Sequence, residues 1–300
     1  MMKVINFGSL NLDYVYSVDH IVKPGETISS YNLQINCGGK GLNQSIALAK
    51  AGVTVYHAGK VGADGGMLTD LLKTYGVNTD NVLISDSRSG NAIIQVDKNG
   101  QNSIVLYPGA NHDIDENMIN SVMQNCNPGD YLLLQNEINN IGIIMEQAHK
   151  AGLTIIFNPS PADASINKLP LDFVSIFVLN EIEGKEISGF ETADEILHGI
   201  HSKYPASKVL LTLGDKGSCY FDGDKIYRQG IIECQVADTT AAGDTFTGYF
   251  IAGLIKGLSP EACLKQASIA ASVAVSRPGA AASIPFLNEI EEMLNGINSL

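Results

Sequence analysis

The sequence predicts a layered α/β fold, in which helices cover both faces of a mostly parallel β-sheet. Two observations support this prediction. Short apolar runs alternate along the chain with segments of helical periodicity. Several of these runs, such as "YLLLQ" and "TIIFNP", are apolar at nearly every position, as in parallel strands that are buried on both faces. A repeated strand–helix order implies right-handed crossovers between neighbouring strands.

The expected elements follow in chain order. Buried strands are expected at 4–9, 54–61, 131–135, 154–159, 173–180 and 208–214. Helices are expected at about 42–51, 66–75, 116–124, 140–151, 182–188 and 193–203. The last third is predicted to be helical over 242–257, 259–276 and a short amphipathic segment at the end of the chain. Between these helices, "RPGAAASIP" (277–285) is expected to be a loop, because proline interrupts it twice.

Two segments depart from this alternation. Residues 14–36 have no helical period and contain the turn "KPGE", and residues 91–107 alternate on either side of "DKNGQN", which is typical of a hairpin. Together they are expected to form a small antiparallel sheet that serves as a lid over the strand ends. The alternative is a simple extension of the main sheet at its edge.

The composition limits the function. The 300 residues and their 45% hydrophobic content predict one domain over 1–300 with a substantial core. A net charge of −13 argues against a nucleic-acid partner, and no apolar stretch is long enough to span a membrane. The five cysteines are odd in number and form no CxxC pair, which predicts reduced thiols in a cytoplasmic protein.

The segment "DTTAAGDTFTG" (238–248) places small residues and one acid where a helix is expected to begin. The first N–H groups of a helix have no partner inside the helix and attract anions, provided that small side chains let the anion approach. The pattern therefore indicates a phosphate site with Asp244 beside it. Two alternatives remain at this point: close helix packing explains the small residues, and a favourable helix dipole explains Asp244.

Three further motifs carry polar groups. In "NCGGKGLNQ", glycines flank Lys40 ahead of an apolar helix, which suits the approach of a polar ligand but does not match a Walker loop. In "GSLNLD", Asn11 and Asp13 are expected to end the first strand and face the same way, as hydroxyl ligands or as turn residues. In "LNEIEG", Asn180 and Glu183 suit either water around Mg²⁺ or a helix cap.

These motifs, in this order, resemble the ribokinase-like (PfkB) carbohydrate kinase family over essentially the whole chain. The two signature segments are "GGKGLNQSIALAKAGVTVYHAGKVGADGG" and "DTTAAGDTFTGYFIAG", and "KPGET", "YPGAN" and "LNEIE" stand in the expected places. The resemblance implies a three-layer fold with a β-sheet lid over the sugar. It also implies ATP-dependent phosphorylation of an alcohol group, assisted by Mg²⁺.

The resemblance assigns the phosphate chemistry to named residues. Asp244 matches the general base, and the backbone N–H groups of Ala241, Ala242, Gly243 and Asp244 match the anion hole. Asn180 and Glu183 match the residues that hold Mg²⁺ through water. The nucleotide would lie along Asn180, Thr212, Gly214, Gly243 and Ser268. Ser268 stands where many members have Asn near the adenine, so the base preference stays open.

The sugar side resembles the members that phosphorylate D-ribose at O5. The residues that align with their ribose contacts are Asn11, Asp13, Gly39, Lys40, Asn43, Glu137 and Asp244, and Ala92 and Ile94 would line the lid. An activating K⁺ would be held by Asp238, Thr240, Ala274, Arg277, Gly279 and Ser283. The expected protein is a cytoplasmic homodimer paired through its lids. Alternatives within the family are a kinase of 2-deoxyribose, of a fructose-type sugar or of a nucleoside, and a more distant one is a non-catalytic sugar-binding regulator.

Overall fold

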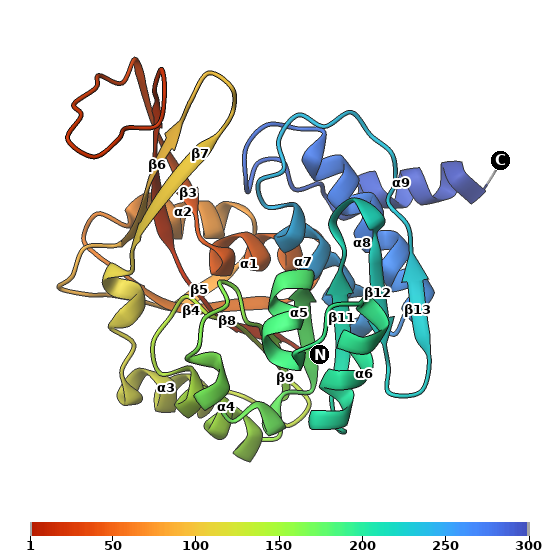
Figure 1. Ribbon diagram of the computed structural model, residues 1–300. Helices are drawn as coiled ribbons and strands as arrows, with labels where there is room; N and C mark the ends of the chain where they lie inside the picture. Colours follow the sequence, from red (N-terminus) through yellow and green to blue (C-terminus); the bar gives the residue numbers. More distant parts are fainter. Residues whose placement is uncertain (1, 299–300) are drawn as a thin grey trace.

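The computed structural model describes residues 2–298. Within them, nine strands form one sheet in the order β13-β12-β11-β10-β9-β8-β1-β4-β5 (Figure 1). The strands are β1 (Val4–Phe7), β4 (Val55–Val61), β5 (Asn78–Ile84), β8 (Tyr131–Gln135), β9 (Thr154–Asn158), β10 (Ile176–Asn180), β11 (Lys208–Thr212), β12 (Ser218–Phe221) and β13 (Ile226–Gln229). Only the β11–β12 and β12–β13 pairs are antiparallel among these, so the predicted mostly parallel sheet is confirmed.

Helices cover both faces of this sheet, as predicted. One face packs against α1 (Lys40–Lys50), α2 (Gly66–Thr74), α7 (Ala242–Ile255), α8 (Pro260–Val275) and α9 (Leu287–Asn298). The other face packs against α3 (Glu116–Met123), α4 (Ile141–Lys150), α5 (Glu181–Ser188) and α6 (Ala193–Lys203). Successive strand residues point to opposite faces, so neighbours such as Leu132 and Leu133 belong to different apolar clusters. Burial on both faces explains the continuous apolar runs.

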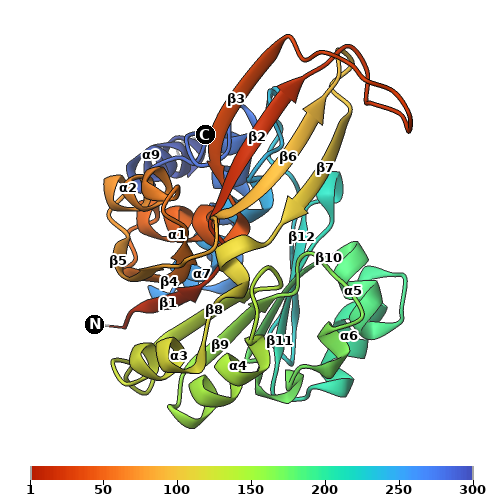
Figure 2. The same cartoon turned by 90° about the vertical axis from the view of Figure 1, so that its left-hand side faces the viewer.

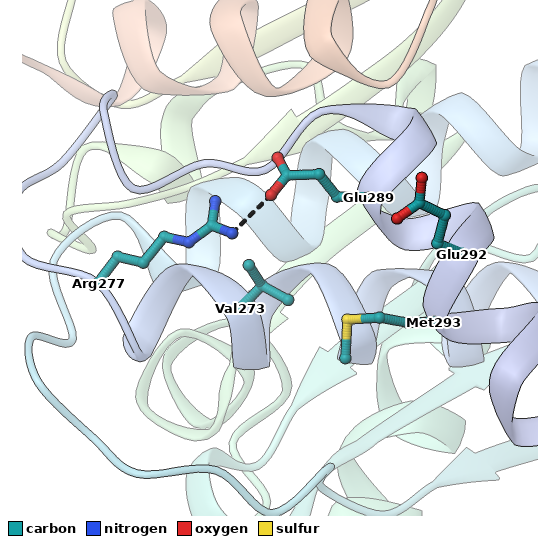
Figure 3. A pocket seen from close by; sticks show the side chains of 5 residues that line it. All are labelled: Val273, Arg277, Glu289, Glu292 and Met293. Carbon is teal, nitrogen blue, oxygen red and sulfur yellow. Dashed lines mark hydrogen bonds and ion pairs between the residues drawn. The ribbon is translucent and has the colours of Figure 1, made fainter.

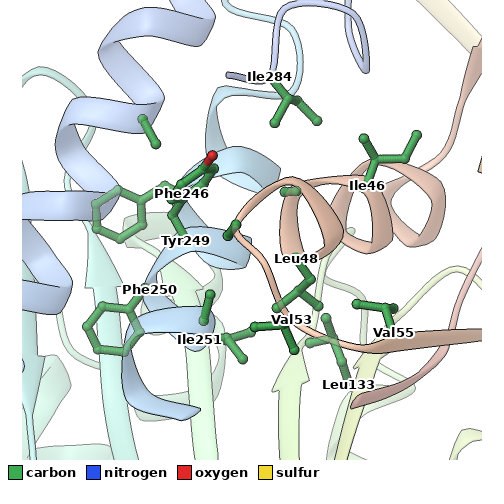
Figure 4. Close-up of a cluster of buried hydrophobic side chains, with 14 of the residues drawn as sticks. Ile46, Leu48, Val53, Val55, Leu133, Phe246, Tyr249, Phe250, Ile251 and Ile284 are labelled. Atoms are coloured by element: carbon green, nitrogen blue, oxygen red, sulfur yellow. The ribbon is translucent and has the colours of Figure 1, made fainter. Parts of the chain in front are cut away.

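The contact between α1 and α7 lies at the centre of the first cluster (Figure 4). Tyr249 and Phe250 on α7 are fully buried, as are Ile46 and Leu48 on α1. The two helices approach closely at Gly248, where an added Cβ would lie 2.4 Å from the Cβ of Ala47. This packing fixes the start of α7 relative to the start of α1, which is the relation on which the site depends.

A second, smaller sheet stands apart from the main body (Figure 2). Its order is β3-β2-β6-β7, from β2 (Asn11–Ser17), β3 (Asn32–Gly38), β6 (Gly90–Val96) and β7 (Asn102–Tyr107). The expected hairpin is present, but the sheet is mixed rather than antiparallel, because β2 and β6 run parallel. Asn11 and Asp13 begin β2 and do not end the first strand, since β1 stops at Phe7.

Other boundaries differ from the sequence expectation by a few residues. β10 begins at Ile176 rather than at 173, because 171–173 form a 3₁₀ turn. β11 ends at Thr212, just before Gly214 adopts a φ of 58°. The sequence did not predict strands β5, β12 and β13. About half of the residues of β5 are polar, and β12 and β13 are only four residues long each and form a hairpin. Among residues 2–298, no helix combines the length and the apolar character needed to cross a membrane.

Candidate active site

The site is built where the end of β1 passes directly beneath the start of α1. A Cβ on Gly41 would lie 2.3 Å from the Ser9 amide nitrogen, so only glycine allows this approach. Gly39, immediately before the helix, has a φ of 96°, which is also a glycine conformation. Strand β1 lies between β4 and β8, at the point where the chain changes direction across the sheet. Ligands of open α/β sheets bind at such a point.

Lys40 and Glu137 form an ion pair at this crossing. The backbone N–H and the Nζ of Lys40 each lie 3.1 Å from the Glu137 carboxylate, which also accepts a hydrogen bond from the Ser9 hydroxyl. Burial alone disfavours the ammonium, but the Glu137 and Asp244 carboxylates outweigh it and raise the pKa of Lys40 above its ordinary value. Lys40 therefore presents a fixed positive charge to the site.

The small sheet contributes Asn11 and Asp13. The Asn11 Oδ1 accepts a hydrogen bond of 2.7 Å from the Asn111 side chain, whose own oxygen accepts from the Leu10 amide at 2.9 Å. Asn111 belongs to the "YPGAN" motif, but sequence reasoning gave it no role. Asp13 rests against Gly38, where a Cβ would lie only 1.9 Å from the carboxylate, so this glycine makes room for the acid.

Asp13 is in an unfavourable position for a charged group. Burial, reinforced by the nearby Glu137 and opposed by Lys40, raises its pKa to about 7. In the register of β2 and β6, Asp13 pairs with Ala92 and Val15 pairs with Ile94. Residues two apart on a strand share a face, so Ala92 and Ile94 lie on the same face of the small sheet as Asp13.

Asp244 lies in the first turn of α7 and meets α1 directly. Its Oδ2 accepts a hydrogen bond of 3.0 Å from Asn43, and its Oδ1 accepts one of 2.9 Å from Gln44. Burial raises the pKa of Asp244 to about 6, while Lys40 and these two amides oppose the shift. The side chains of Asn43, Gln44 and Asp244 thus join the two signature segments. Sequence reasoning missed Gln44, because nothing in a lone glutamine distinguishes it from a packing residue.

The start of α7 is strained. Ala241, at its N-cap, has a φ of 59°, which is uncommon for a residue with a Cβ, and its carbonyl accepts hydrogen bonds from both the amide and the hydroxyl of Thr245 at 2.8 Å. The Ala242 amide donates to Thr239 at 3.2 Å. The amides of Gly243 and Asp244 have no acceptor in the described part of the chain, and the space around Gly243 is open. Two N–H groups are therefore available to an anion.

A cavity of about 680 Å³ lies on the other side of these amides. Its lining includes four of the five residues expected for the nucleotide, namely Thr212, Gly214, Gly243 and Ser268, together with Ala242 of the expected anion hole. Its apolar wall, which sequence reasoning did not find, is formed mainly by Ile231, Ile232, Val236, Phe246, Ala271 and Val275. A cavity of this size with an apolar wall and a few polar groups is typical of a cofactor site.

Asn180 and Glu183 form a helix cap. The Asn180 side chain accepts from the Glu183 amide, and the Glu183 carboxylate accepts from both the backbone and the side-chain nitrogen of Asn180, each at 2.9 Å. Of the two interpretations left open by the sequence, the capping box is present. Burial raises the pKa of Glu183 above its ordinary value, although these hydrogen bonds and Lys40 oppose the change. Neither residue lines the cavity described above.

The residues expected to hold a cation are only partly brought together. Asp238 accepts hydrogen bonds from the Thr240 amide at 2.9 Å and from the Gly279 amide at 3.0 Å, which joins the segment before α7 to the 277–285 loop. Ser283 is buried and its hydroxyl donates to the Ala280 carbonyl at 2.8 Å. The carbonyl of Ala274 already accepts from the Arg277 amide.

The 277–285 loop is held by two sets of side-chain contacts. The Arg277 side chain turns away toward α9, where it forms an ion pair with Glu289 at 2.5 Å beside an open pocket of about 380 Å³ (Figure 3). Only the backbone of Arg277 is therefore left to face a cation. The buried Lys50 ammonium also holds the loop, because it donates to the carbonyls of Ala281 and Ile284 at 3.2 and 2.7 Å.

Comparison with known proteins finds relatives over nearly the whole chain. The family model described as pfkB family carbohydrate kinase matches residues 1–287. A ribokinase from Haemophilus influenzae is 35% identical, and the alignment covers 96% of each chain. A ribokinase from Bacillus subtilis is also 35% identical, covering 98% of this chain and 100% of the relative. The solved structure of Arabidopsis thaliana ribokinase complexed with ribose and ATP has a TM-score of 0.87 at 33% identity, covering 98% of this chain and 99% of that one.

Proposed function

The chain belongs to the pfkB family of carbohydrate kinases, and we propose that it transfers the terminal phosphoryl group of ATP to O5 of D-ribose. The observation that carries this proposal is the position of Asp244. Its carboxylate faces Lys40 and Asn43 on one side, and the free amides at the start of α7 open into the large cavity on the other. This arrangement suits a base between a sugar and a nucleotide.

The proposed reaction is an in-line displacement at phosphorus. Asp244 accepts the proton of the O5 hydroxyl, the oxygen forms a bond to the terminal phosphorus of ATP, and the bond from that phosphorus to the departing ADP oxygen breaks. A pKa of about 6 leaves Asp244 ionised at neutral pH yet basic enough to take a proton. The amides of Gly243 and Asp244 would stabilise the charge on the transferred group.

We place the sugar against the group formed by Asn11, Asp13, Gly39, Lys40, Asn43 and Glu137, beneath the small sheet. The two carboxylates accept hydrogen bonds from hydroxyl groups, and Lys40 donates. Ala92 and Ile94 supply an apolar wall on the face that carries Asp13. The small sheet would then act as a lid that excludes water during transfer.

Two cations complete the proposal. Asn180 and Glu183 would hold Mg²⁺ through water, because the carboxylate oxygens keep lone pairs beyond those used in the cap. Asp238, Ser283 and the carbonyls of Thr240, Ala274, Arg277 and Gly279 would hold K⁺, since the irregular 277–285 loop leaves carbonyls that a helix would consume. When bound, the cations neutralise phosphate charge and order the anion hole.

We also propose that two copies pair through their small sheets. The outer strands of this sheet expose apolar side chains, namely Leu33, Ile35, Ile104, Val105, Leu106 and Tyr107, each at least 47% accessible. An open sheet edge with such residues favours pairing with another chain. The five cysteines are all free, which supports a cytoplasmic location.

The role of Asp244 is tested by Asp244→Asn, which keeps the shape but cannot accept the proton. General-base catalysis contributes about 10²–10⁴ in rate, so kcat should fall at least about a hundredfold while ribose still binds. Asp224→Asn, at an exposed turn, is the matched control. A variant at position 244 that keeps more than roughly a tenth of the wild-type kcat would remove the residue from this role.

The choice of sugar is tested with ribose and 2-deoxyribose. A missing hydroxyl would leave Asp13 with an unpaired oxygen in a closed site, and a hydrogen bond to a charged group is worth about 1.5–3 kcal/mol, or roughly 10- to 150-fold in kcat/KM. Asp13→Ala should remove most of the preference while slowing both reactions. Equal use of the two sugars by the wild type, or better use of a nucleoside, would contradict ribose as the substrate but leave a kinase.

The K⁺ proposal predicts faster turnover in K⁺ than in Na⁺ or choline at matched ionic strength. Asp238→Asn should weaken this dependence, because it removes the proposed charged ligand while retaining an acceptor for the Gly279 amide. Initial rates in the three salts, for both proteins, are the measurement. Identical wild-type rates in all three salts would contradict the cation site.

The dimer is tested by light scattering at micromolar concentration. The wild type should have twice the mass of the 31.9 kDa chain. Val105→Lys, on the exposed outer strand, should give a monomer by placing a charge in the contact, whereas Ile84→Lys, on a comparably exposed residue of the main sheet, should not. A monomeric wild type would end this proposal.

A further inference from the structure

A branched row of buried amides lies behind Asp244, and the proposed reaction does not use it. Gln44 on α1, Gln135 at the end of β8 and Asn6 in β1 are each completely buried. Buried amides are costly unless they are hydrogen-bonded. The Gln135 side chain joins the other two, because its nitrogen donates to Gln44 Oε1 at 2.7 Å and to Asn6 Oδ1 at 3.1 Å.

The first branch leads to the catalytic carboxylate. The Gln44 oxygen accepts a hydrogen bond from Gln135, so both hydrogens of the Gln44 amide are left to donate. One donates to Asp244 Oδ1 at 2.9 Å and the other to Asn158 Oδ1 at 3.0 Å. Asn158 is itself fixed, because its nitrogen donates to the Val178 carbonyl at 2.9 Å. A rotated Gln44 amide would set its oxygen against two other acceptors, so only one orientation is compatible with its neighbours.

Gln135 is held in a way that favours this branch. Its oxygen has no hydrogen-bond partner in the described part of the chain, although the atom is buried. If the Gln135 amide were rotated, its oxygen would face the oxygens of Gln44 and Asn6, and neither hydrogen bond would form. The side chain therefore leaves one acceptor unsatisfied and donates both hydrogens, which is the arrangement that orients Gln44 toward Asp244.

The second branch provides an internal comparison. Asn6 donates to Ser45 Oγ at 2.8 Å, Ser45 lies 2.8 Å from His57 Nδ1, and His57 Nε2 lies 3.2 Å from the Gly8 carbonyl. Burial lowers the pKa of His57 to about 4, so the ring is neutral. This branch ends at a backbone carbonyl and does not reach Asp244. Gln44 and Ser45 are thus adjacent, equally buried residues, and only Gln44 contacts the base.

We propose that Gln44 is a positioning residue for phosphoryl transfer: locked by Gln135, its amide holds the Asp244 carboxylate in one orientation and stabilises its ionised form. The inference rests on the proposed function, in which Asp244 is the base. The charged groups that face this carboxylate are Lys40, which favours its ionisation, and Glu137, which opposes it. Gln44 supplies a fixed dipole that does not itself titrate.

The test is the pH dependence of kcat with ribose and ATP, at constant K⁺ and Mg²⁺, for the wild type, Gln44→Met and Ser45→Ala. Methionine has a similar length but no donor. The acidic limb of the Gln44→Met profile should shift upward by about one pH unit, because the Asp244 carboxylate is protonated more readily once it has lost this hydrogen bond. The kcat at pH 8 should fall about ten- to a hundredfold with the KM for ATP unchanged. Ser45→Ala should keep the wild-type limb.

The outcomes separate the inference from the function on which it rests. If Asp244→Asn is inactive but the limb of folded Gln44→Met coincides with that of the wild type, the inference is overturned and the function stands. An equal shift in Ser45→Ala also overturns it, since α1 would then be loosened as a whole. If Gln44→Met does not fold, the test uses Gln135→Met, which frees the Gln44 amide to rotate. Its acidic limb should shift in the same direction by a smaller amount. An unshifted limb of Gln135→Met overturns the proposal.

Discussion

The site depends on one close contact, the passage of the β1 strand end under the first turn of α1. A side chain on Gly41 would collide with the Ser9 amide, and one on Gly8 would lie 2.5 Å from the Gly41 Cα. The contact places the start of α1 directly over the carboxyl end of β1. From there Lys40 reaches Glu137, and Asn43 and Gln44 reach Asp244. Without the glycines, the two signature segments would not meet.

The same contact concentrates charge. Three carboxylates, those of Asp13, Glu137 and Asp244, surround the single ammonium of Lys40. The pKa values of Asp13 and Asp244 are raised to about 7 and 6, which means that the folded chain keeps protons that the unfolded chain has already released. Their contribution to stability is therefore lost as the pH rises from the ordinary carboxyl range to about 7. Packing elsewhere, including that between α1 and α7, has to offset this cost.

The sequence predicted the parts of this arrangement that follow local rules. Continuous apolar runs indicated the parallel strands, and the segment around Asp244 indicated the start of a helix. It did not predict that Asn11 and Asp13 belong to a separate sheet, because only residues 8–10 separate β1 from β2 and the two strands read as one. Nor did it find Gln44, Gln135 or Asn111. Buried amides have no characteristic spacing, and their partners lie on strands and helices that are distant along the chain.

The segment 238–245 contains three structural features that affect one another. Asp238 ties the 277–285 loop to the turn before α7, Ala241 begins the helix in a strained left-handed conformation, and Asp244 meets α1. Because only two residues separate Asp238 from Ala241, a change in the loop alters the backbone that aims the Gly243 and Asp244 amides. The strain at Ala241 persists because the Thr245 amide and hydroxyl both hold its carbonyl. The loop is therefore linked to the backbone that precedes Asp244, whereas Gln44 contacts the Asp244 carboxylate directly through its side chain.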